Sequence, residues 1–245
     1  MMNDKARSLG CEHTNFITPN GLDAEGHYTT AKDLAIIASY AIKNENFIEI
    51  TNSTTHQFTE ITKGRTFTVS NKNRFLYMMK GAIGVKTGFT NDAGYCFVGA
   101  VKRMDRTLIS VVLGCGWPPS KTLKWKDTQE LMDYGIENYN LKQIYEDKQL
   151  EPVSVHNGRQ KLEALKMHGD LELLMREDEK VAIEYSLPDK LEAPVKENQI
   201  VGYAKYFIDQ VPYTQIPIYT TREVKRINYP YCFRKLLKLW SVNVN

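Results

Sequence analysis

Long apolar runs are absent from this sequence, and no stretch is long and apolar enough to predict a helix that spans a bilayer. The opening residues, Met1 to Arg7, also lack the apolar core of a signal peptide, so we expect no export signal within this chain. The 245 residues include 42% hydrophobic and 25% charged residues, as is typical of a folded soluble protein. This length allows one large or two modest domains.

Metal and disulfide patterns are missing as well. The four cysteines have no paired spacing, so the sequence predicts neither a disulfide framework nor a zinc site. The five histidines are scattered, without a His-x-x-x-His pair, and we expect no metal and no cofactor. The formal net charge of +3 is too small to indicate a nucleic-acid partner.

Residues 1–140 mix predicted helices with predicted strands. Thr30 followed by Asp33 is typical of a capping box, and the apolar residues that follow at helical spacing predict a helix packed on a core. The other elements predicted here are extended segments over residues 67–73, 82–87, 95–101 and 108–113, the last two as a hairpin, and a helix over residues 122–138.

Residues 141–221 have a different pattern, in which short apolar strands alternate with turn signals such as Asn157-Gly158. Regularly spaced short strands predict a small all-β domain. Nothing in it has the pattern of a catalytic site, which favours a spacer or interaction domain. The predicted strands cover residues 153–156, 162–167, 171–175, 181–185, 201–207 and 215–219.

Residues 222–245 form a basic tail. On a helix, Phe233, Leu236, Leu237 and Trp240 share one face, and the cations at 234, 235 and 238 occupy the opposite face. This pattern is typical of an amphipathic helix at a membrane surface. A terminal helix docked on the protein's own core is the alternative; the purely cationic polar face favours the membrane.

The triplet Lys86-Thr87-Gly88 carries the most chemistry in the chain. Lys86 supplies a positive charge, Thr87 supplies a hydroxyl for a carboxylate or carbonyl, and Gly88 lets a substrate backbone lie against the strand. This triplet is one of three motifs of β-lactamases and penicillin-binding proteins. A single tripeptide also arises by chance, so the triplet alone is a weak signal.

A much longer match then places the triplet in context. The stretch from Met2 to Gly10, the segment Pro19-Asn20-Gly21-Leu22-Asp23 and the run from Gly26 to Ala35 resemble the D-alanyl-D-alanine carboxypeptidases, which are low-molecular-mass penicillin-binding proteins that trim peptidoglycan stem peptides. Lys86-Thr87-Gly88 lies about where that family has its third active-site motif. The β-rich part and the tail resemble the family's C-terminal domain and membrane anchor.

The resemblance implies a fold and a set of domains. Residues 1–140 would be the C-terminal part of a mixed α/β (α+β) transpeptidase domain of the penicillin-binding and β-lactamase type. Residues 141–221 would be the family's small all-β domain, and residues 222–245 would be its amphipathic anchor.

Two family motifs have no counterpart in the sequence. None of the serines is followed by lysine three residues on, as a Ser-x-x-Lys nucleophile motif requires. No serine lies in a matching Ser-x-Asn motif; residues 70–73 and 241–243 come nearest. We therefore expect a C-terminal piece of the enzyme that is inactive alone.

For the matched residues, the resemblance implies roles in a serine-type acyl transfer. Lys86 would add positive potential beside the nucleophile, and Thr87 would bind the terminal carboxylate, with Gly88 leaving the strand open. The backbone N–H of Phe89 would be one of two oxyanion donors. Arg74 would lie near the substrate carboxylate, or would be a surface arginine before a strand. Lys124 stands where the family has arginine, and lysine cannot form the same two-bond clasp.

These roles imply partners and a location. The substrate would be a peptidoglycan stem peptide ending in D-Ala-D-Ala, and β-lactam antibiotics would bind the full-length enzyme. The tail would place the protein on the extracytoplasmic face of the cytoplasmic membrane, in the cell envelope. Two other functions fit parts of the pattern: a non-catalytic cell-wall binding module, and a β-lactamase-like hydrolase, against which the β-rich part and the basic tail argue.

Overall fold

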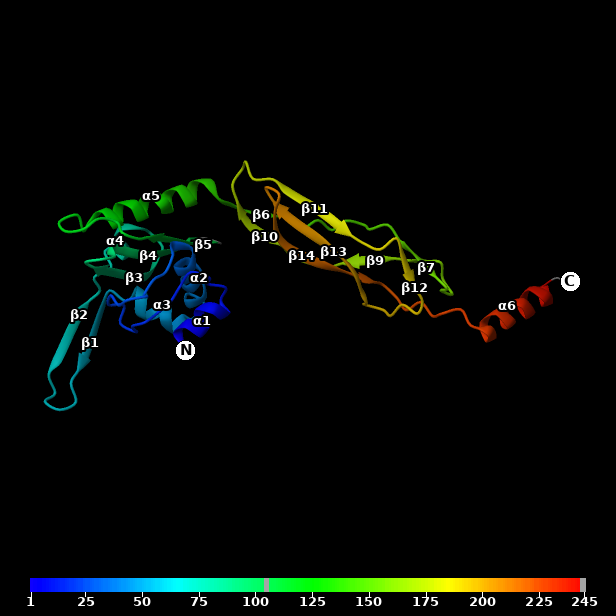
Figure 1. Ribbon diagram of the computed structural model, residues 1–245, viewed down its shortest axis with the longest axis horizontal. Coiled ribbons are helices and arrows are strands. Elements are labelled where there is room, and N and C mark those ends of the chain that lie inside the picture. The colour runs from blue at the N-terminus through cyan, green and yellow to red at the C-terminus, as the bar shows by residue number, and fades with distance from the viewer. Residues whose placement is uncertain (104–105, 243–245) are drawn as a thin grey trace. The chain divides into compact units, whose positions relative to one another are not determined.

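The computed structural model describes residues 1–103 and 106–242 (Figure 1). The chain divides into two compact units, Met1–Asn140 and Leu141–Asn245. The first unit mixes helices and strands, and the second consists of short strands followed by a final helix. This confirms the mixed α/β fold and the β-rich part that the sequence predicts.

A three-stranded antiparallel sheet organises the first unit. Its strands are β3 (Ala82–Thr90), β4 (Gly94–Arg103) and β5 (Arg106–Val112), in the order β3-β4-β5. The hairpin predicted around residues 102–106 is confirmed as β4 and β5, although residues 104–105 of its turn lie outside the described part. Strand β3 continues three residues beyond the predicted end, so that it contains the whole Lys86-Thr87-Gly88 triplet.

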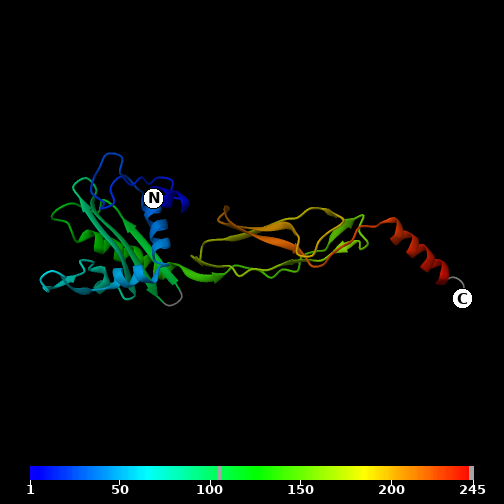
Figure 2. The same ribbon diagram turned by 90° about the horizontal axis from the view of Figure 1, so that it is seen from below.

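Helices cover both faces of this sheet. Figures 1 and 2 show α1 (Met2–Ser8), α2 (Ala31–Ala41) and α3 (Glu45–Asn52) on one side, and α5 (Leu123–Asn138) on the other. The short helix α4 (Phe75–Met78) contributes to the same core as α5. Alternate residues of a strand point to opposite faces. The core on the α5 side therefore takes Phe97 and Val101 from one alternate set of β4 side chains and adds Phe75, Met79, Trp125 and Met132.

The start of α2 is fixed by two polar residues. The hydroxyl of Thr30 accepts a hydrogen bond from the Asp33 backbone N–H at 3.1 Å, which confirms the predicted cap. The Asp33 side chain, however, does not complete the box. It is buried and accepts hydrogen bonds from the His13 N–H at 2.8 Å and the Thr14 hydroxyl at 2.7 Å. Asp33 therefore ties the preceding loop to α2.

An exposed hairpin follows α3. Its strands are β1 (Thr55–Thr59) and β2 (Thr66–Ser70), which pair in antiparallel register. The sequence predicts β2 but not its partner β1. Asn71 holds the base of the hairpin by donating to the backbone carbonyls of Thr51 and Ser53, at 3.3 and 2.9 Å.

The second unit contains three sheets of short strands. A four-stranded sheet in the order β11-β13-β14-β9 is the largest, beside a three-stranded sheet β12-β7-β8 and the pair β10-β6. The strands are β6 (Asn140–Gln143), β7 (Val153–His156), β8 (Leu162–Glu163), β9 (Leu165–Met167), β10 (Glu172–Met175), β11 (Val181–Ser186), β12 (Lys190–Glu192), β13 (Ile200–Ile208) and β14 (Val211–Thr220).

The single strand predicted over residues 162–167 is wrong, because the chain changes sheets at Ala164. Strand β8 pairs with β7, whereas β9 pairs with β14. The side chain of Glu163 is fully buried at this point, where its carboxylate accepts from the N–H groups of Thr221 and Arg222, both at 2.9 Å. A buried carboxylate with fixed partners interrupts the strand.

Helix α6 (Tyr229–Val242) ends the described part of the chain. It confirms the terminal helix that the sequence predicts. Measured over the described residues, none of the helices combines the length and the apolarity needed to cross a membrane.

Stability in acid tests the role of Asp33. Three groups, with the Thr14 hydroxyl first, hold the pKa of Asp33 below its ordinary value, so its contribution to stability is present above that ordinary value. We expect this contribution to disappear as the pH falls below about 4, through the pKa of the folded state. Urea unfolding of the wild type and of Asp33→Asn should show a difference in unfolding free energy at pH 7 that shrinks at pH 3.

The exposed Asp23→Asn variant is the matched control and should match the wild type at both pH values. A difference for Asp33→Asn that is equally large at pH 3 would contradict the assigned contacts.

Candidate active-site strand

The triplet lies on an outer strand of its sheet. Strand β3 pairs only with β4 among the described strands, so its other edge carries no neighbouring strand. Within the pair, Thr87 lies opposite Phe97, Gly88 opposite Cys96, and Phe89 opposite Tyr95. An open strand edge can hydrogen-bond an extended peptide through its backbone.

The register shows which backbone groups face that open edge. The N–H of Tyr95 donates to the Gly116 carbonyl at 2.9 Å, and its carbonyl accepts from the Cys115 N–H at 2.8 Å, both on the side away from β3. Directly opposite residues in an antiparallel pair either exchange hydrogen bonds or both turn away. The backbone groups of Phe89, and of Thr87 two residues earlier, therefore point to the open edge.

Glycine at position 88 is not required by packing inside the protein. A Cβ atom added there would lie 3.7 Å from the Cys96 Cβ, which is an ordinary contact. Its φ is not in the left-handed region. Gly88 is exposed, as is Lys86, whose ammonium donates to the Thr87 backbone carbonyl. The absent side chain therefore matters mainly for what approaches the strand from outside.

A cation and three rings support the end of this strand. The rings of Phe89 and Tyr95 lie 4.5 Å apart, centroid to centroid. The Lys124 ammonium lies 5.1 Å from the Tyr95 centroid and 4.8 Å from the Trp125 centroid. Lys124 comes from the first turn of α5, which packs on the sheet through Trp125.

Lys124 is a buried cation whose pKa is set mainly by its burial. Only 8% of the residue is exposed, and this burial is the main cause that lowers the pKa of Lys124. Cys96 and Cys115 oppose this lowering, and the charge of Lys86 adds the smallest contribution to it. Burial, more than the charge of the triplet, therefore sets the electrostatics of Lys124.

Arg74 is placed differently. It is exposed and directly precedes helix α4, with strand β3 following further along the chain. It borders a groove of about 320 Å³ together with Met78, Trp125 and Lys126. Within the described part of the chain, no hydrogen bond or ion pair joins Arg74 to the triplet.

A hollow of about 570 Å³ lies beside the turn that follows β3. Asp23, Glu25, His27 and Asp92 line it. Three carboxylates would repel an anionic ligand. A carboxylate ligand is therefore better accommodated along Lys86 and Thr87 than in this hollow.

Metal ligands are not gathered at this strand. Over the residues that the structure describes, no cluster of three or more His, Cys, Asp or Glu side chains is arranged to hold a metal ion.

Sequence comparisons identify both units. Residues 1–116 match the family model of D-alanyl-D-alanine carboxypeptidase, and residues 139–226 match that of the penicillin-binding protein 5 C-terminal domain. In chain order, the two units are therefore similar to a D-alanyl-D-alanine carboxypeptidase and to a penicillin-binding protein 5 C-terminal domain. The triplet strand β3 lies within the first match, and all three sheets of the second unit lie within the second.

Curated relatives carry the same name. The chain is 28% identical to D-alanyl-D-alanine carboxypeptidase DacF of Bacillus subtilis over 98% of its length and 62% of that protein. It is 30% identical to DacA of Haemophilus influenzae over 85% of its length and 52% of that protein. A D-alanyl-D-alanine carboxypeptidase of Streptomyces is 36% identical over 55% of this chain and 47% of its own length. The chain thus spans about half to three-fifths of these relatives.

Solved structures agree with this assignment. Penicillin-binding protein 5 from Haemophilus influenzae superimposes with a TM-score of 0.68 and 26% identity, over 92% of this chain and 65% of that one. The Streptomyces K15 DD-transpeptidase gives a TM-score of 0.51 and 35% identity, over 56% of this chain and 52% of that one.

Sequence reasoning missed the residues that hold the triplet's strand in place. Trp117 donates from its ring N–H to the Asn91 carbonyl at 2.6 Å, across the turn between β3 and β4. Gly94 ends this turn with a φ of +67°, and a Cβ there would come within 3.0 Å of the Trp117 ring. A glycine at position 94 is a sequence signal for a tight turn, but nothing in the sequence predicts its contact with Trp117.

Cys115 also supports this region through an unanticipated contact. Its thiol donates to the Asp127 carboxylate at 2.8 Å, which links the loop after β5 to α5. Burial first, and then this hydrogen bond and the negative charge of Asp127, raise the pKa of Cys115 to about 11. The Cys115 thiol therefore stays protonated at neutral pH.

Alkylation rates test this contact. The thiolate is the reactive form of cysteine, so we expect Cys115 to react with iodoacetamide far more slowly at pH 8.5 than the exposed Cys232. Asp127→Asn should lower the pKa of Cys115 and speed its alkylation, as measured by peptide mass spectrometry. The exposed Asp133→Asn variant, on the same helix, is the control. Equal rates for Cys115 with and without Asp127 would rule out the assigned role of this carboxylate.

Proposed function

We propose that this chain forms the substrate-binding part and C-terminal domain of a serine-type D-Ala-D-Ala carboxypeptidase. The whole enzyme would remove the terminal D-alanine from peptidoglycan stem peptides through an acyl-enzyme. The observation that carries the proposal is the Lys86-Thr87-Gly88 triplet on the open edge of β3, in a unit that is similar to a D-alanyl-D-alanine carboxypeptidase.

The geometry of β3 supports a role for each residue of the triplet. Lys86 provides positive potential for the terminal carboxylate of the substrate, and Thr87 binds that carboxylate through its half-buried hydroxyl. Gly88 lets the substrate backbone approach. The Phe89 N–H, which points to the open edge, serves as one oxyanion donor, worth about 3 kcal/mol of transition-state stabilisation in comparable sites.

The supporting residues have separate roles. Lys124 is a positioning residue, because its ammonium lies against the Tyr95 ring, which in turn contacts the Phe89 ring, and it adds positive potential near the strand. Its burial fits this role better than direct contact with substrate. Arg74 has the exposure that a carboxylate-binding arginine needs, and we assign it to the outer margin of the substrate site.

The nucleophile is not among these residues. None of the serines within residues 1–245 is followed by lysine three positions on. The chain therefore supplies recognition and electrostatics, and a serine with its base would have to come from elsewhere in the protein. The same observation favours a second candidate, a wall-binding module without catalysis, and the DNA upstream of Met1 distinguishes the two by the presence or absence of an in-frame Ser-x-x-Lys.

Substrate and location follow from the proposed activity. The partners are a stem peptide that ends in D-Ala-D-Ala and, for the full-length enzyme, β-lactam antibiotics. Both are found outside the cytoplasm, so we place the protein in the cell envelope, on the extracytoplasmic face of the cytoplasmic membrane.

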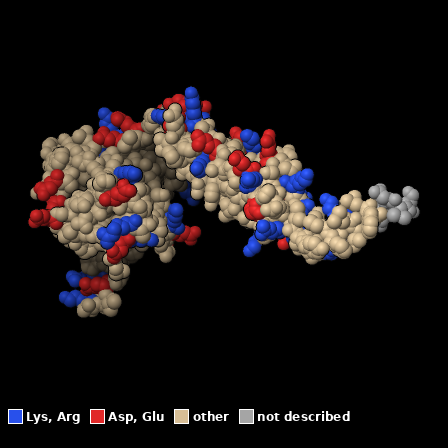
Figure 3. All heavy atoms as spheres, turned by 45° about the vertical axis from the view of Figure 1, so that its right-hand side comes forward, with Lys and Arg blue, Asp and Glu red and all other residues tan. Residues whose placement is uncertain are grey.

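Helix α6 supports attachment to that membrane. Phe233, Leu236, Leu237 and Trp240 are between 47% and 78% exposed. Beside the grey last residues in Figure 3, the visible face of α6 is mostly uncharged, with Lys and Arg at its margins. An exposed apolar face bordered by cations suits the headgroup region of an anionic bilayer.

Penicillin labelling tests the proposed function. We expect the purified 245-residue chain to remain unlabelled by a fluorescent penicillin and to release no D-alanine from a peptide ending in D-Ala-D-Ala. The product that includes an upstream in-frame Ser-x-x-Lys should do both. In that product, Thr87→Val should lower kcat/KM roughly 10- to 100-fold, because a hydrogen bond to a charged group is lost.

The exposed Thr107→Val, on the far strand β5, is the matched control and should retain full activity. Covalent labelling of the 245-residue chain would show that a nucleophile has been overlooked. Full activity of Thr87→Val would remove the assigned carboxylate contact.

Vesicle binding tests the tail. Val224 is buried in the second unit and exchanges backbone hydrogen bonds of 2.9 Å with Val195, so the truncation that spares this unit removes residues 229–245. We expect the full chain, but not this truncation, to co-sediment with vesicles containing anionic lipid, and less so at high salt. A Leu236→Glu, Trp240→Glu double variant should also fail to bind.

The matched control for the double variant is Glu223→Gln with Glu197→Gln, which changes charge away from α6. Unchanged sedimentation of the truncation would show that α6 is not the anchor.

A further inference from the structure

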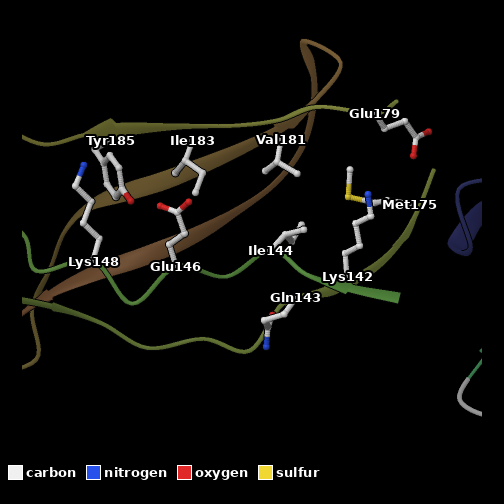
Figure 4. Close-up of a pocket in the computed structure, with 10 residues that line it drawn as sticks. All are labelled: Lys142, Gln143, Ile144, Glu146, Lys148, Met175, Glu179, Val181, Ile183 and Tyr185. Carbon is white, nitrogen blue, oxygen red and sulfur yellow. The ribbon is translucent and has the colours of Figure 1, made fainter. Parts of the chain in front are cut away.

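A groove in the second unit is lined by none of the residues assigned to the candidate active site. It has a volume of about 480 Å³, within the range of small-molecule sites, and is formed between β11 and residues 142–148. Figure 4 shows Val181 and Ile183 along β11 and Ile144 on the facing segment, with polar side chains at both ends of the groove.

One end of the groove holds polar groups without partners. The Tyr185 hydroxyl is buried and makes no hydrogen bond. Across from it, the Glu146 carboxylate makes no hydrogen bond or ion pair with any described residue, and the two side chains point toward one another in Figure 4. Burial first, and then the charge of Glu146, raise the pKa of Tyr185. The Lys148 ammonium lies 4.8 Å from the Tyr185 ring centroid.

The unpartnered Tyr185 hydroxyl indicates a place for a polar ligand, because buried polar atoms are nearly always paired. Tyr206 lies opposite Ile183 in the β11–β13 pair, and directly opposite residues share one face of a sheet. The Tyr206 hydroxyl does not add to this argument, because Tyr206 is fully buried and a hydrogen bond with the Glu146 backbone contributes to its pKa.

The polar side chains at the other end of the groove already have partners within the protein. Lys142 donates to the Arg176 carbonyl at 3.2 Å and pairs with Glu177 at 3.5 Å. Glu179 accepts from the Arg176 N–H at 2.8 Å. Recognition must therefore occur at the end formed by Glu146, Lys148 and Tyr185.

These groups discriminate between classes of ligand. A carboxylate ligand at this end would face Glu146, and an ammonium ligand would face Lys148, so neither charge is favoured. Hydroxyl groups both donate and accept, and they can satisfy Glu146 and Tyr185 together. The apolar side chains of Ile144 and Ile183 and the tyrosine ring suit the apolar face of a sugar ring.

We propose that this groove binds a neutral saccharide, with ring hydroxyls on Glu146 and Tyr185 and one ring face on Ile144 and Ile183. The inference concerns the second unit alone and stands apart from the proposed carboxypeptidase function. If sugar binding fails, that proposal is unaffected.

A titration of the 245-residue chain with β-1,4-linked N-acetylglucosamine disaccharide tests the site. Binding is monitored by the chemical shifts of ¹⁵N-labelled amides and by calorimetry. We expect saturable shifts confined to residues 142–148 and 181–185, with little dependence on salt. Glu146→Gln and Tyr185→Phe should each weaken binding about tenfold, because each removes one partner of the sugar hydroxyls.

Glu184→Gln is the matched control, since Glu184 lies on the same strand but on the opposite face, and it should bind like the wild type. Circular dichroism of each variant verifies folding, and Tyr185→Phe keeps the ring that packs on the core. The proposal would be overturned by any of three outcomes. These are the absence of saturable shifts, unchanged binding by both groove variants, and preferential binding of the zwitterionic dipeptide D-Ala-D-Ala in this groove.

Discussion

The pairing register between β3 and β4 is the constraint on which the candidate active site depends. The backbone groups of Tyr95 form hydrogen bonds with residues 115 and 116, which follow β5. The backbone groups of Phe89, directly opposite Tyr95, therefore point to the open edge of the sheet. A shift of one residue would direct the Phe89 N–H into the sheet and reverse the faces of Lys86 and Thr87. The register therefore determines which groups reach a ligand, whereas the triplet's composition determines only which groups are available.

That constraint explains what the sequence could predict about this unit and what it could not. The run of β-branched and aromatic residues along β4 and the cap at Thr30 are local signals, and both predicted their elements correctly. Strand β3 extends to Thr90, and Trp117 contacts Asn91 just beyond it. Both features depend on residues 26 positions apart, which no local pattern connects. Asp33 illustrates the limit: its position suited a cap, but its side chain instead satisfies the loop at residues 13–14.

In the second unit, regular spacing was enough to predict short strands, but not which sheet each one joins. The buried carboxylate of Glu163 interrupts a strand that reads as continuous, because its partners come from residues 221–222. For the candidate active-site strand, motif and family resemblance predicted Lys86, Thr87, Gly88 and Phe89 as one group. Burial of Lys124 beneath the neighbouring ring of Tyr95 required three-dimensional information.

The indole of Trp117 has a thermodynamic consequence for any ligand of β3. By holding the turn at Asn91 and filling the space beside Gly94, it fixes the end of the strand in the folded protein. The conformational entropy of these turn residues is then lost during folding and not during association. A ligand that binds at this edge meets a strand that is already ordered. Less of the binding free energy is therefore lost in ordering the strand.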